Sequence, residues 1–204
     1  MLYGIIRIFL GVLIFGSIGL GIFKSKVRRK KAFSLIFAIL SIITISISAL
    51  FPVENLFITF DSPEEVFYYT CIGEVKDVIY GEQSCMIVYS TQNNTYSYAI
   101  IRKTEEGYKI SSILSNMKLV KILKQGNSAE ILSLKGTTDY YLWATFISEN
   151  SDIIISDSIN SSFKSIANTE KNINTFISYG FIDELDSNYR LFLDNEEIFN
   201  LKKR

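Results

Sequence analysis

Residues 24–31 read KSKVRRKK, and the six cationic residues among these eight are Lys24, Lys26, Arg28, Arg29, Lys30 and Lys31. A long apolar run lies immediately on either side of this stretch. Clusters of Lys and Arg beside membrane spans stay in the cytoplasm and set the orientation of the neighbouring helices. The stretch therefore predicts a membrane hairpin with a basic cytoplasmic loop, and it places the N-terminus and the C-terminal domain outside the cell.

The two apolar runs cover residues 2–23 and 32–51, and the second run contains no charged residue. About 20 apolar residues in a helix cover the hydrocarbon core of a bilayer. Arg7 interrupts the first run close to the N-terminus, where its side chain can reach the interface; a functional intramembrane arginine is the alternative. The cations follow the first run, whereas those of a signal peptide precede it. Residues 1–51 are therefore predicted to be a retained transmembrane hairpin in the lipid bilayer.

Small residues recur along both runs. Close approach of helices in lipid relies on such residues, and they also serve dimerisation. They predict that the two helices pack against each other, with dimerisation as an alternative. The positions are Gly11, Gly16, Ser17, Gly19, Gly21, Ser34, Ala38 and Ser41.

Charge is distributed unevenly along the 204 residues, although the net charge is zero. Residues 1–51 contain seven Lys or Arg and no acidic residue, and residues 52–204 contain 14 cations and 21 anions, a net charge of −7. An acidic domain argues against nucleic acid, which requires clustered Lys and Arg. The chain has no histidine, the usual general base and the commonest transition-metal ligand. The composition implies no cofactor and makes catalysis less expected.

A tether at residues 52–61 is predicted to lead into the outer domain, residues 62–204. Ser62 suits a helix N-cap, Pro63 suits the first helical position, and Glu65 completes a capping box. A short helix is therefore predicted to begin at Pro63.

Short runs rich in Val, Ile and Tyr follow, separated by turn residues, and this pattern predicts an antiparallel meander. Residues 172–181 fit either a strand or a helix. The fold class expected is a membrane helical hairpin plus an α+β, mostly antiparallel domain, either continuous or divided near Gly126. The strands expected cover residues 74–80, 84–90, 96–103, 108–113, 117–124, 130–134, 140–147, 152–156, 189–193 and 197–199.

Three stretches, SPEEVF at 62–67, VIYGEQS at 78–84 and FIDELDSNY at 181–189, resemble small membrane-anchored exported proteins of Gram-positive bacteria. Those proteins also open with a Ser-Pro-Glu-Glu helix and continue into a hairpin of this kind. The resemblance implies a cell-surface location and carries no catalytic residue across.

Cys71 and Cys85 are the only cysteines, and outside the cell they could form one disulfide. A tight turn near Glu82 would set Cys85 opposite about Ile79. The two sulfurs then meet only if a helix ending at Cys71 folds back over the sheet. A disulfide and two buried free thiols both remain open.

Acidic and aromatic clusters are the remaining candidates for a binding site. The run at residues 183–188 comes nearest to a calcium loop without matching its ligand spacing, and a solvated turn is the default. Tyr68-Tyr69 and the run at residues 140–143 suit a stacking platform or, as we favour, a core.

These features favour a non-catalytic binding or accessory protein displayed on the cell surface, whose partner is an envelope protein or a wall component. One alternative is a histidine-free envelope enzyme that uses carboxylates or Ser-Lys. Another is a small immunity or accessory membrane protein that acts through its hairpin.

Overall fold

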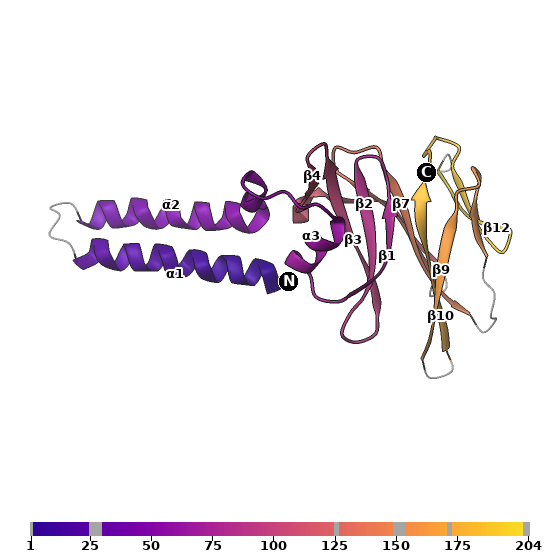
Figure 1. Cartoon of the computed structure of the whole chain (residues 1–204), viewed down its shortest axis with the longest axis horizontal. Coiled ribbons are helices and arrows are strands. Elements are labelled where there is room, and N and C mark those ends of the chain that lie inside the picture. The colour runs from indigo at the N-terminus through magenta and orange to yellow at the C-terminus, as the bar shows by residue number, and fades with distance from the viewer. Residues whose placement is uncertain (1, 25–29, 125–126, 149–153, 171–172, 202–204) are drawn as a thin grey trace.

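Two antiparallel helices project from one end of a β-rich body (Figure 1). The computed structural model describes residues 2–24, 30–124, 127–148, 154–170 and 173–201. The helices are α1 (Leu2–Lys24) and α2 (Lys30–Leu50), and together they form the helical hairpin. Three shorter helices follow: η1 (Val53–Leu56), α3 (Pro63–Thr70) and η2 (Ile113–Ser115).

The hairpin is helical as expected, but its two helices do not have the membrane-spanning character that the sequence predicted. Within the described stretches of the chain, no helix has both the length and the apolar character needed to cross a membrane. The predicted fold class of a membrane-spanning hairpin is therefore wrong. The predicted location, a multi-pass cell-membrane protein with its N-terminus and C-terminal domain outside, is contradicted by the same finding.

The physical reason lies in the charged and polar residues of the two helices. Arg7 and Lys24 bound the uncharged part of α1, and these residues 8–23 cover about 24 Å of a hydrocarbon core that is about 30 Å thick. The uncharged part of α2, residues 32–50, covers about 28 Å. It also includes several hydroxyl side chains: Ser34, Ser41, Thr44, Ser46 and Ser48.

The first four strands form sheet A, in the order β1-β2-β3-β4 and antiparallel throughout. They are β1 (Glu74–Tyr80), β2 (Ser84–Ser90), β3 (Tyr96–Thr104) and β4 (Gly107–Lys109). The first two have the predicted bounds. The fourth is shorter than predicted because the backbone amide of Ile110 donates to the side chain of Asn55 (2.9 Å) instead of extending the strand.

Sheet B has five strands in the order β5-β6-β7-β10-β9. They are β5 (Asn116–Lys124), β6 (Asn127–Leu134), β7 (Tyr140–Ser148), β9 (Phe163–Glu170) and β10 (Ile173–Ile182). The segment that fitted either a strand or a helix is β10, which lies between β7 and β9. Two full ladders on its sides favour the extended conformation there.

Sheet C is smaller and has the order β12-β11-β8. Its strands are β8 (Ile155–Asp157), β11 (Arg190–Leu193) and β12 (Glu196–Asn200). The predicted final hairpin is confirmed by β11 and β12, which pair antiparallel. The first part of the predicted strand at 152–156 lies outside the described residues.

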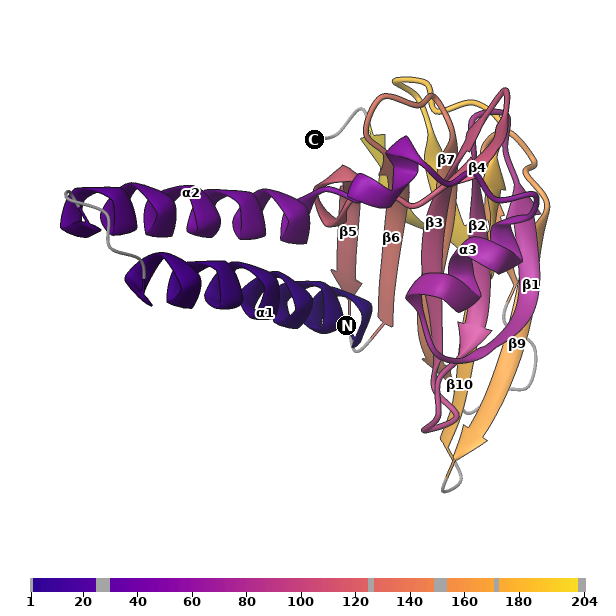
Figure 2. The same cartoon turned by 60° about the vertical axis from the view of Figure 1, so that its left-hand side comes forward.

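The layers run from α3 through sheet A and sheet B to sheet C. Val66 and Phe67 of α3 pack against Cys85 and Ile87 on one face of β2. The opposite face of sheet A packs on β6, β7 and β10, and the far face of sheet B packs against β8 and β11. Figure 2 shows α3 in front of sheet A with the later strands behind. Sheet B is thus covered on both faces.

A buried carboxylate joins sheet A to sheet B. Asp139 is 1% exposed. Its Oδ1 accepts from the backbone amide of Glu82 (3.2 Å), and its Oδ2 accepts from the amide of Gln83 (2.8 Å) and the hydroxyl of Ser84 (2.7 Å). The β1–β2 turn is therefore fixed by a residue 55 or more positions further along the chain.

Gly81 is required beside this carboxylate. A Cβ at Gly81 would lie 2.6 Å from Asp139 Oδ2 and 2.7 Å from the hydroxyl of Tyr141. Any larger side chain would separate the carboxylate from the turn amides. The turn therefore needs both a glycine and an acceptor-only side chain opposite it.

We predict that Asp139→Asn lowers the free energy of unfolding by about 2 kcal/mol. The side-chain NH₂ of asparagine would replace one acceptor oxygen and would face a hydrogen-bond donor, from which it cannot accept a hydrogen bond. Urea unfolding measures this change. The matched control is Asp183→Asn, which removes the same charge from an exposed residue. Equal stability of the two variants would contradict the structural role of Asp139.

Candidate functional site: the helical hairpin and its base

The inner faces of α1 and α2 pack closely through small residues at some of the predicted positions. A Cβ at Gly11 would lie 3.1 Å from Ile45 Cγ1, and a Cβ at Gly19 would lie 3.6 Å from the ring of Phe37. The rings of Phe15 and Phe37 lie 6.2 Å apart between centroids. Helix packing therefore accounts for Gly11 and Gly19.

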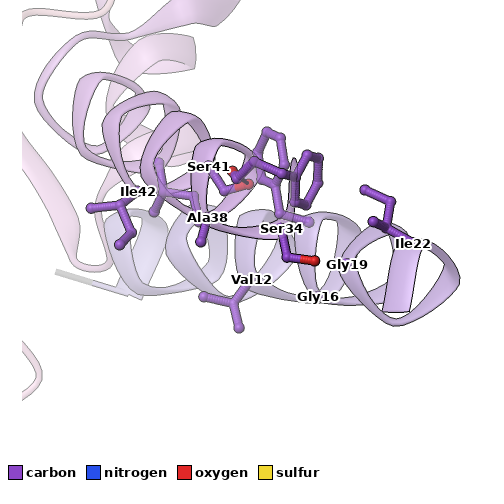
Figure 3. A pocket seen from close by; sticks show the side chains of 11 residues that line it. Val12, Gly16, Gly19, Ile22, Ser34, Ala38, Ser41 and Ile42 are labelled. Atoms are coloured by element: carbon purple, nitrogen blue, oxygen red, sulfur yellow. Dashed lines mark hydrogen bonds between the residues drawn. The ribbon is translucent and has the colours of Figure 1, made fainter. Parts of the chain in front are cut away.

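Other small residues leave open space. A Cβ at Gly16 or at Gly21 would meet nothing within 4 Å. Gly16, Ser34 and Ala38 instead line an apolar groove of about 330 Å³ between the two helices, with Val12 and Ile42 beside it (Figure 3). The groove is large enough to receive bulky apolar side chains.

The outer faces of the hairpin carry exposed apolar side chains from Ile8 to Leu20 on α1 and from Phe33 to Leu50 on α2. Most of the exposed large hydrophobic residues of the described chain lie on the hairpin or at its base, where Phe57 is 87% exposed. Apolar surface of this extent is unusual on a monomer and marks an interaction site. The exposed residues of α1 and α2 are Ile8, Phe9, Val12, Leu13, Ile14, Ile18, Leu20, Phe33, Leu35, Ile36, Ile39, Leu40, Ile42, Ile43, Ile47 and Leu50.

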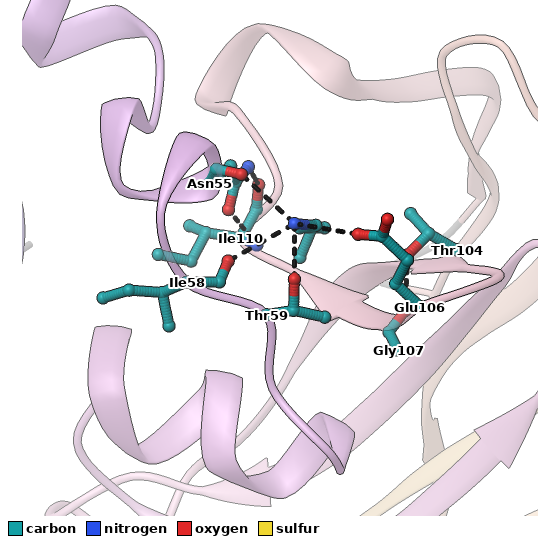
Figure 4. A network of polar contacts seen from close by, with 8 residues as sticks. Asn55, Ile58, Thr59, Thr104, Glu106, Gly107 and Ile110 are labelled. Atoms are coloured by element: carbon teal, nitrogen blue, oxygen red, sulfur yellow. Dashed lines mark hydrogen bonds and ion pairs between the residues drawn. The ribbon is translucent and has the colours of Figure 1, made fainter.

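The base of the hairpin is held to sheet A by a polar network around Lys109 (Figure 4). The Lys109 ammonium donates to the backbone oxygen of Asn55 (3.2 Å), that of Ile58 (3.5 Å) and the hydroxyl of Thr59 (2.5 Å). It also lies 3.8 Å from the carboxylate of Glu106. One lysine of β4 therefore holds several parts of the segment predicted to be a tether.

Side-chain hydrogen bonds and one backbone bridge strengthen this attachment. Asn55 donates to the carbonyl of Ile110 (2.8 Å) and accepts from its amide (2.9 Å). Phe60 forms an isolated β-bridge with Tyr108, and the Ser112 hydroxyl donates to the carbonyl of Leu50 at the end of α2 (2.7 Å). Residues 52–61 are thus an ordered joint, and sequence reasoning missed Asn55 and Lys109 because their contacts span more than 50 residues.

The predicted N-cap Ser62 of α3 is confirmed, whereas Glu65 accepts from the amide of Asp61 and not from that of Ser62, and these residues bring acidic groups to the hairpin base. The amide of Glu65 donates to Ser62 Oγ (3.3 Å), and the amide of Asp61 donates to the Glu65 carboxylate (3.1 Å). α3 contacts α1, whose N-terminal end lies beside the β-rich body (Figure 1). Asp61, Glu64 and Glu65, here called the acidic base, therefore lie at the opposite end of the hairpin from the basic stretch.

The basic stretch at residues 24–31 joins the two helices: Lys24 ends α1, and Lys30 and Lys31 begin α2. Lys26, Arg28 and Arg29 lie outside the described residues. Lys24, Lys30 and Lys31 therefore lie at the far tip of the hairpin, about 35 Å from the base at 1.5 Å per residue over α1.

Both cysteines are free thiols. Cys71 follows the end of α3, and Cys85 is buried in β2 opposite Tyr80 and Ile101. Burial, followed by the charge of Glu64, raises the pKa of the Cys85 thiol to about 12. Cys71 is only partly buried, so the expectation of two buried thiols fits Cys85 alone.

The acidic and aromatic clusters predicted from the sequence lie mainly in turns and in the core. Asp186 accepts from the backbone amide of Asn188 (2.9 Å), as in an ordinary polar turn. No group of three or more acidic or Cys side chains in the described residues is arranged to hold a metal ion. Tyr141 and Trp143 belong to the core between sheets A and B, whereas Tyr68 and Tyr69 are exposed at the hairpin base.

Glu130 of β6 forms the most buried ion pair described, with a side chain 10% exposed. Its oxygens lie 2.8 and 2.9 Å from the Lys118 ammonium and 3.2 Å from the Tyr98 hydroxyl. Burial raises the pKa of the Glu130 carboxyl, but Lys118, Tyr98 and Lys121 together lower it, so the net shift is downward. The carboxylate therefore stays ionised and holds β5 and β3 against β6.

A further buried polar centre lies where sheet C meets the β8–β9 connection. Asp157 Oδ1 accepts from the amides of Ile159 (3.2 Å) and Ser161 (2.8 Å). Among the described residues, Asp157 Oδ2, Ser161 Oγ and the Tyr189 hydroxyl are buried without a hydrogen-bond partner. Burial, then the charge of Asp157, raises the pKa of the Tyr189 hydroxyl, so this group remains a neutral donor.

Comparisons with known proteins returned no match to any family model, curated protein or solved structure.

We predict that Lys109→Met increases amide hydrogen exchange across residues 54–60, because the ammonium that joins these residues to β4 is lost. A rise of about tenfold corresponds to the loss of one to two hydrogen bonds. Lys103→Met, at an exposed position of β3, is the matched control. Unchanged protection in the Lys109 variant would show that the backbone pairing alone holds the joint.

We predict that Glu130→Gln lowers the free energy of unfolding at pH 7 by about 2 kcal/mol. The folded-state pKa of Glu130 is depressed, so its stabilisation is present above the ordinary pKa of 4.5 and is lost as the pH falls through the folded-state value. The difference between the variant and the original chain should therefore shrink toward pH 3. Urea unfolding from pH 3 to pH 7 measures it, with exposed Glu184→Gln as the control; a difference independent of pH would refute the assignment.

Proposed function

We propose that this chain is a non-catalytic accessory protein that docks through the outer faces of its helical hairpin onto an apolar protein surface. The observation that carries this proposal is the concentration of exposed apolar side chains on α1, α2 and the hairpin base. Each large apolar side chain removed from water contributes about 1.5–3 kcal/mol. Several such residues on one face suffice for specific binding.

The buried carboxylates and the buried thiol of the β-rich body support this proposal, because they serve the packing of the sheets. The chain has no histidine. Asp139 accepts hydrogen bonds from Gln83 and Ser84, and Glu130 accepts one from Tyr98, so both carboxylates join sheet B to sheet A. Cys85 is buried with a raised pKa, which suppresses the reactive thiolate. These groups act in stability and leave the hairpin as the binding element.

The ordered joint gives the docking a consequence for the rest of the molecule. Because Lys109, Asn55 and Ser112 hold the hairpin base to sheet A, docking through the hairpin fixes the orientation of the β-rich body. We therefore propose that the hairpin is the docking element and that the β-rich body is what it presents to the surroundings.

We predict that Ile36→Gln combined with Ile43→Gln abolishes association through the hairpin. These side chains are 58% and 48% exposed on one face of α2, so the change removes apolar contact without opening the helix-to-helix packing. The matched control is Ile147→Gln combined with Ile154→Gln, at similarly exposed positions of the β-rich body.

Sedimentation velocity of the purified full chain in buffer measures the outcome. We expect assemblies heavier than 23.3 kDa for the original chain and the control, and a shift to the monomer for the α2 variant. A monomeric original chain that leaves apolar fluorescent dyes unbound would refute the proposal. Circular dichroism checks that α2 stays helical in the variant.

A further inference from the structure

We propose that a second copy of this chain covers the hairpin, with the two hairpins side by side and antiparallel. This inference rests on the proposed function, because it names the apolar protein surface onto which the hairpin docks. The distribution of charge along the hairpin and the extent of its apolar surface carry the argument.

The two ends of the hairpin carry opposite charge. The tip has Lys24 at the end of α1 and Lys30 and Lys31 at the start of α2. The base has the acidic side chains of Asp61, Glu64 and Glu65, beside the N-terminal end of α1. One hairpin therefore has a positive tip, an uncharged apolar middle and a base at which three carboxylates outnumber the cation Arg7 of α1.

An antiparallel pair satisfies both ends at once. The tip of each copy then lies beside the acidic base of the other, so that opposite charges meet twice. A parallel pair would bring the two basic tips together and the two acidic bases together. Like charges repel within the screening length of about 8 Å at physiological salt, so charge selects the antiparallel direction.

The apolar area is adequate for a specific pair. The hairpin is about 35 Å long and about 20 Å wide, so one face offers about 700 Å². A stable interface buries about 800 Å² on each partner, and the exposed residues at the base extend the face toward that value: Leu56, Phe57, Tyr68 and Tyr69. The groove beside Gly16 and Ala38 can receive large side chains from the facing helix (Figure 3).

Thiol cross-linking tests the direction of the pair. Phe9, Leu13 and Leu20 lie on one exposed stripe of α1, with Phe9 near the base and Leu20 near the tip. Chains with Phe9→Cys or Leu20→Cys are mixed and treated with a bismaleimide of short span. Both carry Cys71→Ser, and the buried Cys85, with a pKa of about 12, does not react at neutral pH.

Position 9 lies about 16 Å from position 20 along one helix. An antiparallel pair is expected to give the mixed product, joining position 9 of one chain to position 20 of the other, at least tenfold above either same-position product. Products that join 20 to 20 and 9 to 9 would overturn the antiparallel arrangement while leaving docking through the hairpin intact. The absence of any assembly would overturn the second copy, and it would also overturn docking through the hairpin if apolar dyes leave the chain unbound.

Neutralising the acidic base tests the charge argument. Asp61→Asn combined with Glu64→Gln should weaken association about three- to tenfold at 50 mM salt, as expected for two partly exposed ion pairs. The effect should disappear at 500 mM salt. Asp183→Asn combined with Glu184→Gln removes the same charge far from the hairpin and should leave association unchanged. Equal weakening by both double variants would refute a role for the acidic base.

Flotation with phosphatidylcholine vesicles distinguishes another apolar occupant. A second copy is supported if cross-linking in the presence of vesicles still gives the pair and the chain stays in the dense fraction. If the vesicles prevent the cross-link and carry the chain upward, an aliphatic lipid surface covers the hairpin, and the proposal of a second copy is overturned.

Discussion

The structure depends on the burial of sheet B on both faces. Its central strands β6 and β7 direct Ile131 and Leu142 toward sheet C and direct Leu132 and Tyr141 toward sheet A. The apolar faces of sheets A and C are therefore buried because each packs against one apolar face of sheet B. Any polar atom within this layer must find its partner inside the protein, since an unpaired buried polar group costs about 1–3 kcal/mol.

That constraint explains where the charged groups of the β-rich body are found. Asp139 accepts three hydrogen bonds from the β1–β2 connection, and Glu130 pairs with Lys118 of the neighbouring strand. Both carboxylates lie at boundaries between layers, where they fix the relative position of two strands or sheets. These two buried carboxylates are thus committed to the packing of the sheets.

Local structure was predictable where local patterns decide it. The bounds of β1 and β2 and the cap of α3 follow from alternation and from Ser62, Pro63 and Glu65, whose partners are near neighbours. The pairing of β7 with β10 and the role of Asp139 depend on residues far apart, which no local pattern reveals. The hairpin itself was predictable as two helices, but its membrane interpretation gave too little weight to Arg7 and the hydroxyl residues of α2.

The joint between hairpin and body links the two halves of the chain energetically. A freely flexible tether would let the hairpin dock without consequence for the sheets. Here the ammonium of Lys109 and the side chain of Asn55 connect residues 55–59 to β4 and to Ile110 just beyond it, and α3 packs against both α1 and sheet A. If a partner covers α1 and α2 as proposed, these contacts transmit the restraint to the body and set which surface of the sheets faces outward.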